Sequence, residues 1–506
     1  SGLTMLLVGF SAGLPLLLIF STLSVWLREA GVERSAVTFF SWAALGYSFK
    51  FIWAPLIDML PLPVLTARLG RRRGWLLISQ LMIVTAIVAM ALINPSQGSK
   101  SLTIMALAAV FLGFSSATQD IVIDAYRIEI AEDSLQALLA SMYIAGYRGG
   151  MLVAGAGSLF LADFFGTAAG NYVYLSWQKT YFVMAATMGI GILTTLIARE
   201  PESRKKRTHN YSSFDYGRFL FLFLLIATSF ACCFFFSGSL LKDLSAFFLE
   251  TVHFDAGLSG FLVQFLRFAC SIGVAAAVAF GLSRSGIVRH DMVLTSYVEP
   301  IAEFFRRYSL YSAILLLLLI GMYRLSDIVL GVVSNVFYLD MGFSKSAIAG
   351  ITKTFGLGMT LAGGFLGGVL TVRFGVLRIL MLGAFLSSAT NLLFMFLAGV
   401  GENTLALTVV IGADNLSAGI ATTAFVAFLS SLTSISFTAM QYAIFSSLMT
   451  LFPKLIGGYS GTMVSQIGYS AFFVATAVMG IPVMLLIWLI GKNQKSQVRT
   501  AAETKD

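Results

Sequence analysis

The chain has 506 residues, of which 58% are hydrophobic and only 11% charged, and its formal net charge at pH 7 is +9. Soluble domains carry about 25% charged residues, so this composition excludes a string of soluble domains. It predicts one all-α polytopic membrane protein whose helices cross the bilayer many times.

Apolar stretches of about 20 residues predict fourteen membrane helices. Six precede Arg204, six follow Arg307, and the seventh and eighth lie between them as an inserted hairpin. We expect these helices at 5–28, 36–59, 75–94, 101–128, 136–161, 179–198, 218–240, 257–283, 310–339, 346–371, 377–399, 403–432, 437–458 and 468–491.

A repeated pattern divides the chain. GVERSAV at 31–37 and GFSKSAI at 342–348 each open an apolar stretch, and each stretch ends in a basic turn, at 68–73 and at 373–378. Two related halves that pack around a polar site are typical of secondary transporters. We therefore predict a six-helix bundle over 1–200, a linker with the hairpin over 201–309, a second bundle over 310–491 and a tail over 492–506. The segment 293–307 is expected to be an amphipathic helix on the cytoplasmic surface.

Lysine and arginine predict the orientation. Most of them fall in or beside the connections that share a side with the N-terminus, which places both termini in the cytoplasm. The run SRKKR at 203–207 could be a polynucleotide patch, but beside a membrane helix we interpret it as a topology signal. Membrane topology then explains the net positive charge, and no nucleic-acid partner is needed to account for it.

The fourth predicted helix carries two acids four residues apart, Asp120 and Asp124, on one helix face. Two like charges in a partly buried place favour the protonated form of one of them, which is the setting of a proton site. No histidine lies in a predicted span, so a proton carrier has to be a carboxylate. The alternative is a structural salt bridge to Arg148. Asp327 and Asp414 are reserve candidates, and Arg127 and Glu129 are more consistent with gate or topology residues.

Basic residues inside spans are costly and usually face a cavity or a partner. Arg148 lies mid-span among glycines that allow close helix packing, and a guanidinium binds a carboxylate through two parallel bonds. Arg324 either acts with it or is neutralised by Asp327, and Lys50 could instead extend to the interface. The expected substrate-binding residues are Arg148, Arg324, Lys50, Lys353, Tyr147, Tyr143, Gln119, Asn415 and Gln441.

A gate is predicted at the first basic turn. Asp58 ends the second helix, and an acid there can hold one side of a rocking bundle closed against arginines on the next helix. The gating residues expected are Asp58, Arg68, Arg71, Arg72 and Arg73.

Several runs together resemble a known family: GFSAGLPL (9–16), FKFIWAPLID (49–58), GRRRGWLLISQ (70–80), SSATQDIVIDA (115–125), GYRGGML (146–152) and TAMQYAIFSSL (438–448). They are similar to the muropeptide permease AmpG family, a branch of the major facilitator superfamily related to acetyl-coenzyme A transporters. The resemblance implies the major facilitator fold and proton symport of anhydro-muropeptides (GlcNAc-1,6-anhydroMurNAc with or without peptide). They would enter from the periplasm across the inner membrane for peptidoglycan recycling. It also implies a link to β-lactamase induction and antibiotic resistance.

Two other functions stay open. One is transport of another anionic conjugate such as acetyl-coenzyme A. The other is a membrane enzyme such as a lipid-linked sugar transferase, which would need a metal-binding acid pair or a nucleophile, and the sequence has no DxD, HxxxD or P-loop pattern. We expect a monomer in contact with membrane lipid, a glycopeptide substrate and protons, without cofactor, metal or nucleic acid.

Overall fold

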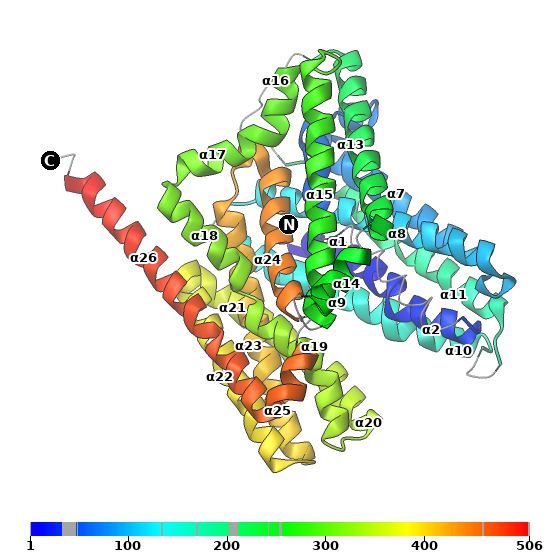
Figure 1. Cartoon of the computed structure of the whole chain (residues 1–506), viewed down its shortest axis with the longest axis vertical. Coiled ribbons are helices and arrows are strands. Elements are labelled where there is room, and N and C mark those ends of the chain that lie inside the picture. The colour runs from blue at the N-terminus through cyan, green and yellow to red at the C-terminus, as the bar shows by residue number, and fades with distance from the viewer. Residues whose placement is uncertain are drawn as a thin grey trace.

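The computed structural model describes residues 2–32, 47, 49–132, 135–167, 171–201, 211–240, 242–251, 256–457 and 460–503. These residues form helices and no β-strand. The predicted all-helical class is therefore confirmed for this part of the chain (Figure 1).

The first half runs from α1 to α12. Its helices are α1 (Gly2–Ile19), α2 (Ser21–Glu29), η2 (Lys50–Ile52), α5 (Ala54–Met59), α6 (Leu65–Leu69), α7 (Arg71–Ala91), η3 (Pro95–Gln97), α8 (Ser99–Ile130), α9 (Gln136–Leu152), η5 (Val153–Gly157), α10 (Ser158–Phe164), α11 (Tyr174–Thr187) and α12 (Gly189–Ile197).

A middle region and the second half follow. The middle region comprises α13 (Ser213–Leu240), α14 (Lys242–Glu250), α15 (Ala256–Arg284), α16 (His290–Val293), η6 (Leu294–Val298) and α17 (Glu299–Arg307). The second half comprises α18 (Leu310–Met322), α19 (Leu325–Asp340), α20 (Lys345–Ile348), η7 (Ala349–Phe355), α21 (Gly356–Phe374), α22 (Val376–Val400), α23 (Thr404–Leu432), η8 (Ile435–Phe437), α24 (Thr438–Gly457), α25 (Ser460–Val478) and α26 (Gly480–Glu503).

Twelve helices among the described residues are long and apolar enough to cross a membrane, and each corresponds to a predicted span. Half of the predicted span 36–59 lies outside the described residues, and its described end contains η2 and α5. The predicted span 257–283 corresponds to α15, in which a shorter apolar stretch, Ala269–Arg284, is found. The total of fourteen therefore stays a prediction.

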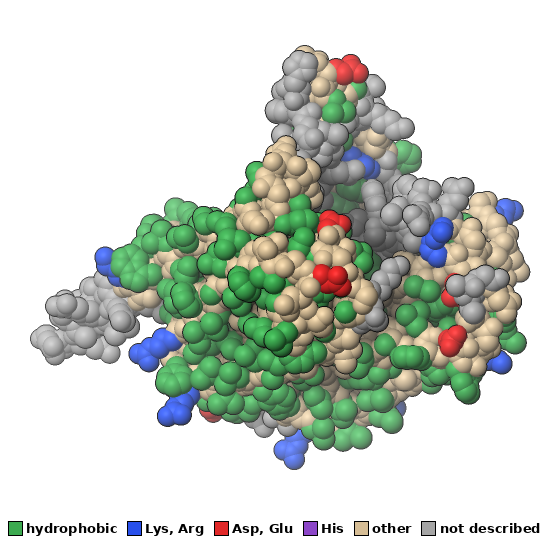
Figure 2. All heavy atoms as spheres, turned by 90° about the horizontal axis from the view of Figure 1, so that it is seen from below, with side chains coloured by type: hydrophobic (Ala, Val, Ile, Leu, Met, Phe, Trp, Pro, Cys, Tyr) green, Lys and Arg blue, Asp and Glu red, His purple; other side chains and the backbone are tan. Residues whose placement is uncertain are grey.

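The outer surface suits a lipid environment. Large apolar side chains such as Phe160, Leu193 and Leu405 are exposed, and Figure 2 shows hydrophobic side chains over much of the described surface with few, scattered Lys and Arg side chains. A soluble protein rarely exposes so much apolar surface.

Glycines bring α1 and α9 into backbone contact. A Cβ atom on Gly13 would lie 2.0 Å from the carbonyl oxygen of Tyr147, and one on Gly146 would lie 1.8 Å from that of Leu6. Only a residue without a side chain fits at such a crossing. The contact fixes the rotation of α9, the helix that carries Arg148.

The two halves meet through a few helices. In the second half, α24 packs against α5, η2 and α8, while α21 and α23 pack against α9 of the first half. In the sequence, the hairpin α13–α15 lies between the two halves. In the folded chain, α13 shares a hydrophobic cluster with α5, α8 and α24. Figure 1 shows the far ends of the halves pointing in different directions, with α2 and α10 on one side and α20 and α25 on the other.

One face of the molecule gathers the ends of many helices. The connections after α5, α8, α12, α15 and α23 meet there, because residues 58–73, 127–136, 195–201, 288–307 and 430–441 contact one another. We call this surface the basic face, since it carries the first basic turn.

Candidate functional site

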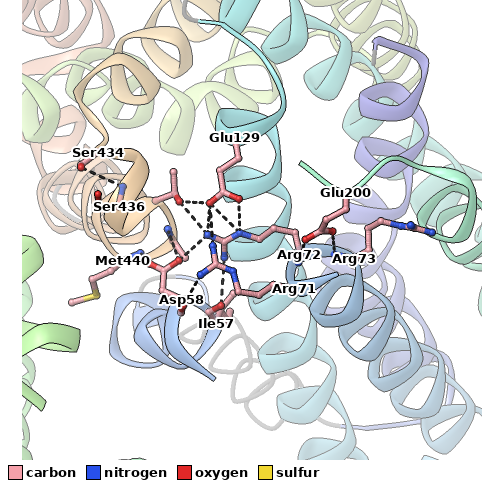
Figure 3. A network of polar contacts seen from close by, with 12 residues as sticks. Ile57, Asp58, Arg71, Arg72, Arg73, Glu129, Glu200, Ser434, Ser436 and Met440 are labelled. Carbon is pink, nitrogen blue, oxygen red and sulfur yellow. Dashed lines mark hydrogen bonds and ion pairs between the residues drawn. The ribbon is translucent and has the colours of Figure 1, made fainter. Parts of the chain in front are cut away.

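The basic face holds a buried ionic cluster around Arg72, at the start of α7 (Figure 3). The Arg72 side chain is 1% exposed. Its Nη2 atom lies 2.8 Å from Asp58 Oδ1, and its Nε donates to Glu129 Oε2 at 3.0 Å. Nη2 also donates to the Thr438 hydroxyl at 3.0 Å. A charge this deeply buried is tolerated because carboxylates and hydrogen bonds surround it.

The cluster joins the two halves. Asp58 accepts hydrogen bonds from the backbone N–H groups of Met440 at 3.0 Å and Ala439 at 3.3 Å. These belong to the first turn of α24, where N–H groups lack partners within the helix and the helix dipole favours a negative charge. The Thr438 hydroxyl donates to Glu129. We call Asp58, Arg72, Glu129 and Thr438 the latch.

The predicted gating residues do not all belong to the latch. Arg71 pairs with Glu129 at 3.6 Å and donates to the Asp58 backbone carbonyl at 2.7 Å. Arg73 instead donates to the carbonyls of Thr195 and Leu196, within the first half. Arg68 is exposed on α6 and makes no ion pair with any described residue. The gating role of all five stays a prediction.

Sequence reasoning missed two members of this region. Thr438 had no signal apart from its place in the TAMQYAIFSSL run. Glu200 caps α7, because its carboxylate accepts from the backbone N–H groups of Arg72 at 2.8 Å and Arg73 at 3.0 Å. An acid directly after the predicted span 179–198, opposite a basic turn, was the available signal for Glu200.

A second contact between the halves lies at Arg127, which is fully buried on α8. Its Nη1 donates to the Ser430 hydroxyl of α23 at 2.8 Å, and its guanidinium lies 5.3 Å from the centre of the Tyr442 ring of α24. Its Nη2 atom also lies 3.5 Å from Oδ1 of Asp124, in the same half of the chain. Arg127 therefore connects a predicted proton-coupling residue directly to the second half.

Asp124 and Asp120 lie in different surroundings. Asp124 pairs with Lys50 at 3.5 Å as well as with Arg127, so the structure gives it these partners rather than Arg148. Asp120 is 9% exposed, and its Oδ1 atom has no hydrogen-bond partner in the described part of the chain. The neighbouring Gln119 bonds Ser11 at 3.4 Å through its amide nitrogen. A buried carboxylate with an unpartnered oxygen is costly when charged.

Arg148 stands open in the middle of α9. Its side chain is exposed although its helix is packed on α1 and on the second half, and it makes no hydrogen bond or ion pair with the residues that the structure describes. Tyr147 and Tyr143 lie beside it on the same helix, with ring centres 5.9 Å apart.

Arg324 and the reserve acids form a polar group in the second half. Arg324 donates to Thr422 at 3.0 Å and pairs with Asp327 at 3.5 Å, which is the mutual neutralisation considered above. Ser387 donates to Asp327, and Thr390 donates to Asp414 at 3.2 Å. Asn415 accepts from Thr360 at 2.8 Å.

The remaining predicted residues lie elsewhere or cannot be placed. Gln441 lies on the basic face, where it bonds to Pro300 and Glu303. The side chain of Lys353, in η7, lies outside the described side chains. His290 begins α16 outside the twelve spans, while His209 and His253 fall outside the described residues. No group of three or more metal-ligating side chains occurs in the part of the chain described.

The chain matches the family model of the Major Facilitator Superfamily over residues 4–322, more than half of its length. It therefore belongs to this superfamily and is a transporter, and the expected fold class is confirmed.

Comparison with named relatives shows which transporters of the superfamily the chain resembles. The chain is 27% identical over 487 residues to the putative transporter AmpG 4 of Rickettsia felis, which covers 96% of this chain and 95% of the relative. It is 28% identical over 484 residues to the anhydromuropeptide permease of Escherichia coli K12, covering 96% and 78%. The resemblance drawn from the sequence is thus confirmed.

Solved structures agree on the fold. A double-tryptophan variant of XylE superposes with a TM-score of 0.61 at 13% identity, covering 97% of this chain and 94% of that one. The Escherichia coli fucose:proton symporter FucP gives 0.59 at 10% identity, covering 97% and 98%. At such identities these likenesses support the fold alone.

Proposed function

We propose that this protein imports anhydro-muropeptides, GlcNAc-1,6-anhydroMurNAc with or without peptide, from the periplasm to the cytoplasm by alternating access driven by protons. It would sit in the inner membrane with both termini and the basic face in the cytoplasm. Supply of muropeptides to the cytoplasm would serve peptidoglycan recycling and, through it, β-lactamase induction. The observation that carries the proposal is the exposed Arg148 in the middle of a packed helix, without an ion pair or hydrogen bond among the described residues, together with the likeness to AmpG transporters and the anhydromuropeptide permease.

Arg148 supplies the chemistry for an anionic substrate. A cation inside a membrane protein without a partner is costly, so it is retained where a ligand or water compensates it. Muropeptides carry carboxylates, and a guanidinium binds a carboxylate through two charge-assisted bonds. Arg324, at the start of α19 in the second half, would offer a second cation. A substrate carboxylate bound by both arginines would draw the halves together around the substrate.

The tyrosines extend the same surface. Tyr143 and Tyr147 lie on α9 with Arg148, and aromatic side chains combine an apolar face with a hydroxyl. This mixture suits a sugar ring, which also has apolar and hydroxyl-bearing faces. Asn415 from the second half would add an amide.

Proton coupling follows a chain of contacts. Asp120 is buried, and one of its oxygens has no hydrogen-bond partner among the described residues. Asp124 links Lys50 to Arg127, which bonds Ser430 in the second half. Protonation of this acid pair from the periplasm would weaken the hold on Arg127 and so loosen its contact with α23. Release of the proton to the cytoplasm would restore it. One proton supplies about 1.4 kcal/mol per pH unit of gradient.

The test is uptake of radiolabelled anhydro-muropeptide into proteoliposomes with an imposed pH gradient. We expect accumulation above equilibrium that a protonophore abolishes, and competition by unlabelled muropeptide but not by acetyl-coenzyme A. Competition by acetyl-coenzyme A alone would favour transport of another anionic conjugate. A chemically altered product in the vesicles would favour an enzyme.

A further inference from the structure

A segment on the basic face ties the two halves together independently of the latch. It covers residues 288–307 and includes α16, η6 and α17. The predicted amphipathic helix 293–307 lies within it and is helical as expected. We call residues 288–307 the strap. The strap takes no part in the proposed substrate binding or proton coupling.

The N-terminal end of the strap is fastened to the first half and the hairpin. Val288 and Met292 are fully buried in a cluster that contains Trp53 and Ile57 and that also includes Met440 of α24. The Tyr297 hydroxyl donates to the backbone carbonyl of Ile52 at 3.1 Å. Ile52 belongs to η2, the short helix that also carries Lys50.

The C-terminal end of the strap is fastened to the second half. Phe304 is buried against Phe445 of α24, with ring centres 5.3 Å apart. Arg307 donates to the carbonyl of Leu432, the last residue of α23, at 2.8 Å. The two ends of one short segment thus hold opposite halves.

Gln441 is the anchor of this second attachment. Its amide nitrogen donates to the Pro300 carbonyl at 2.8 Å and to Glu303 at 2.7 Å, and its amide oxygen accepts from the Ser434 N–H at 2.7 Å. It lies one turn after Thr438, so the first turn of α24 is held by the latch on one side and by the strap on the other. All its polar atoms are used in these bonds.

The strap has an irregular turn in its middle. Residues Leu294–Val298 form a π-helix, η6, which includes the anchor Tyr297, and Pro300 follows after one further residue. Single π-turns are rare and occur frequently at functional sites, and Pro300 has no N–H to extend the helix hydrogen bonding. Once the bonds at one end are released, the strap can bend there without unfolding the other end.

We propose that the strap is a second clamp between the halves and that Gln441 is a positioning residue of this clamp. The clamp favours the conformation in which the basic face is closed. The opening of that face then requires release of the Gln441 bonds to Pro300 and Glu303 as well as of the latch. This inference does not depend on which substrate is carried, and it gives Gln441 a role different from the substrate contact expected from the sequence.

The test measures the distance between the halves at the basic face by electron spin resonance. Cys232, Cys233 and Cys270 would be replaced by Ser, and spin labels placed at R68C and R373C, one exposed position in each half. In Gln441→Leu we expect the population with the longer distance to rise about tenfold, because the bond to the Glu303 carboxylate is charge-assisted. Tyr297→Phe removes one neutral hydrogen bond and should raise the population with the longer distance by a smaller factor.

Controls separate this effect from general damage. Gln97→Leu and Tyr311→Phe change exposed side chains outside the strap and should leave the distances unchanged. Unchanged distances in both Gln441→Leu and Tyr297→Phe would overturn the proposal, and if Gln441→Leu fails to fold, the outcome for Tyr297→Phe alone decides. A loss of muropeptide affinity in Gln441→Leu without a change in distance would identify it as a substrate ligand and equally overturn the clamp. Failure of muropeptide binding in the wild type would affect the proposed substrate only.

Discussion

Asp58 of the first half accepts a hydrogen bond from the backbone N–H of Met440 in the second half, at 3.0 Å. The same carboxylate pairs with the buried Arg72. The Asp58 carboxylate therefore both pairs with a buried cation of the first half and accepts a hydrogen bond from the N-terminus of α24 in the second half. Any movement that separates the halves at the basic face has to break these contacts.

Asp58→Asn should open the basic face. The substitution keeps the size of the side chain but removes the charge that Arg72 and the first turn of α24 require. Loss of one partner of a buried pair costs about 3–5 kcal/mol, partly offset here by Glu129. We expect a lower melting temperature and faster thiol labelling of a cysteine introduced on the basic face. Arg378→Gln, at an exposed position without an ion pair among the described residues, is the matched control and should behave as wild type; equal labelling of the two variants would argue against the latch.

Ser430→Ala should weaken the inner contact between the halves. It removes the acceptor for Arg127, a bond to a charged group worth about 1.5–3 kcal/mol. We expect a similar loss from Arg127→Met, and the double variant should lose less than the sum of the two because the residues act together. Thermal unfolding of the four proteins measures the coupling. Simple additivity would mean that the 2.8 Å contact contributes little.

Gly146→Ala should destabilise the first half. Its new Cβ would lie 1.8 Å from the Leu6 carbonyl oxygen, so α1 and α9 have to separate, at a cost of about 1–3 kcal/mol or more. Gly149→Ala is the control on the same helix, because its Cβ would meet only a Phe10 ring carbon at 3.8 Å. Melting temperatures in detergent should fall for the first variant only, and a similar fall in both would indicate a general effect of alanine on α9.

Asp120→Asn and Asp124→Asn should separate coupling from binding. An amide cannot carry the proton, so accumulation driven by a pH gradient should be lost while exchange of substrate across the vesicle membrane continues. Parallel accumulation and exchange assays distinguish the two. If both variants accumulate substrate normally, α8 is structural, and Asp327 and Asp414 of the second half become the coupling candidates.

Hydropathy and the internal repeat predicted most of this architecture. Each of the twelve membrane helices matches an expected span, because burial in lipid requires long apolar runs that are visible in sequence. Asp58 and Arg72 were also predictable as partners, since an acid at one helix end and arginines at the start of the next lie close along the chain. Local sequence spacing was sufficient to predict both the membrane spans and the pairing of these two side chains.

Contacts between distant segments were not predictable in this way. The periodicity of α8 puts Asp120 and Asp124 on one face but does not say which helix lies against it, and that neighbour proved to be η2 with Lys50. The docking of Asp58 on the backbone of α24 involves no side-chain pattern at all. Gln441 bonds to residues 138–141 positions earlier in the chain, and only the tertiary fold brings them together.

The most direct test of the proposed function compares wild-type protein with Arg148→Ala and Arg148→Lys in proteoliposomes. Radiolabelled anhydro-muropeptide is supplied outside under an imposed pH gradient, and folding is checked by melting temperature. We predict that wild type accumulates the substrate, that Arg148→Ala abolishes uptake while remaining folded, and that Arg148→Lys keeps only a small part because an ammonium cannot bind a carboxylate in the bidentate manner. Uptake by Arg148→Ala at the wild-type rate would contradict the account and leave Arg148 as a packing residue.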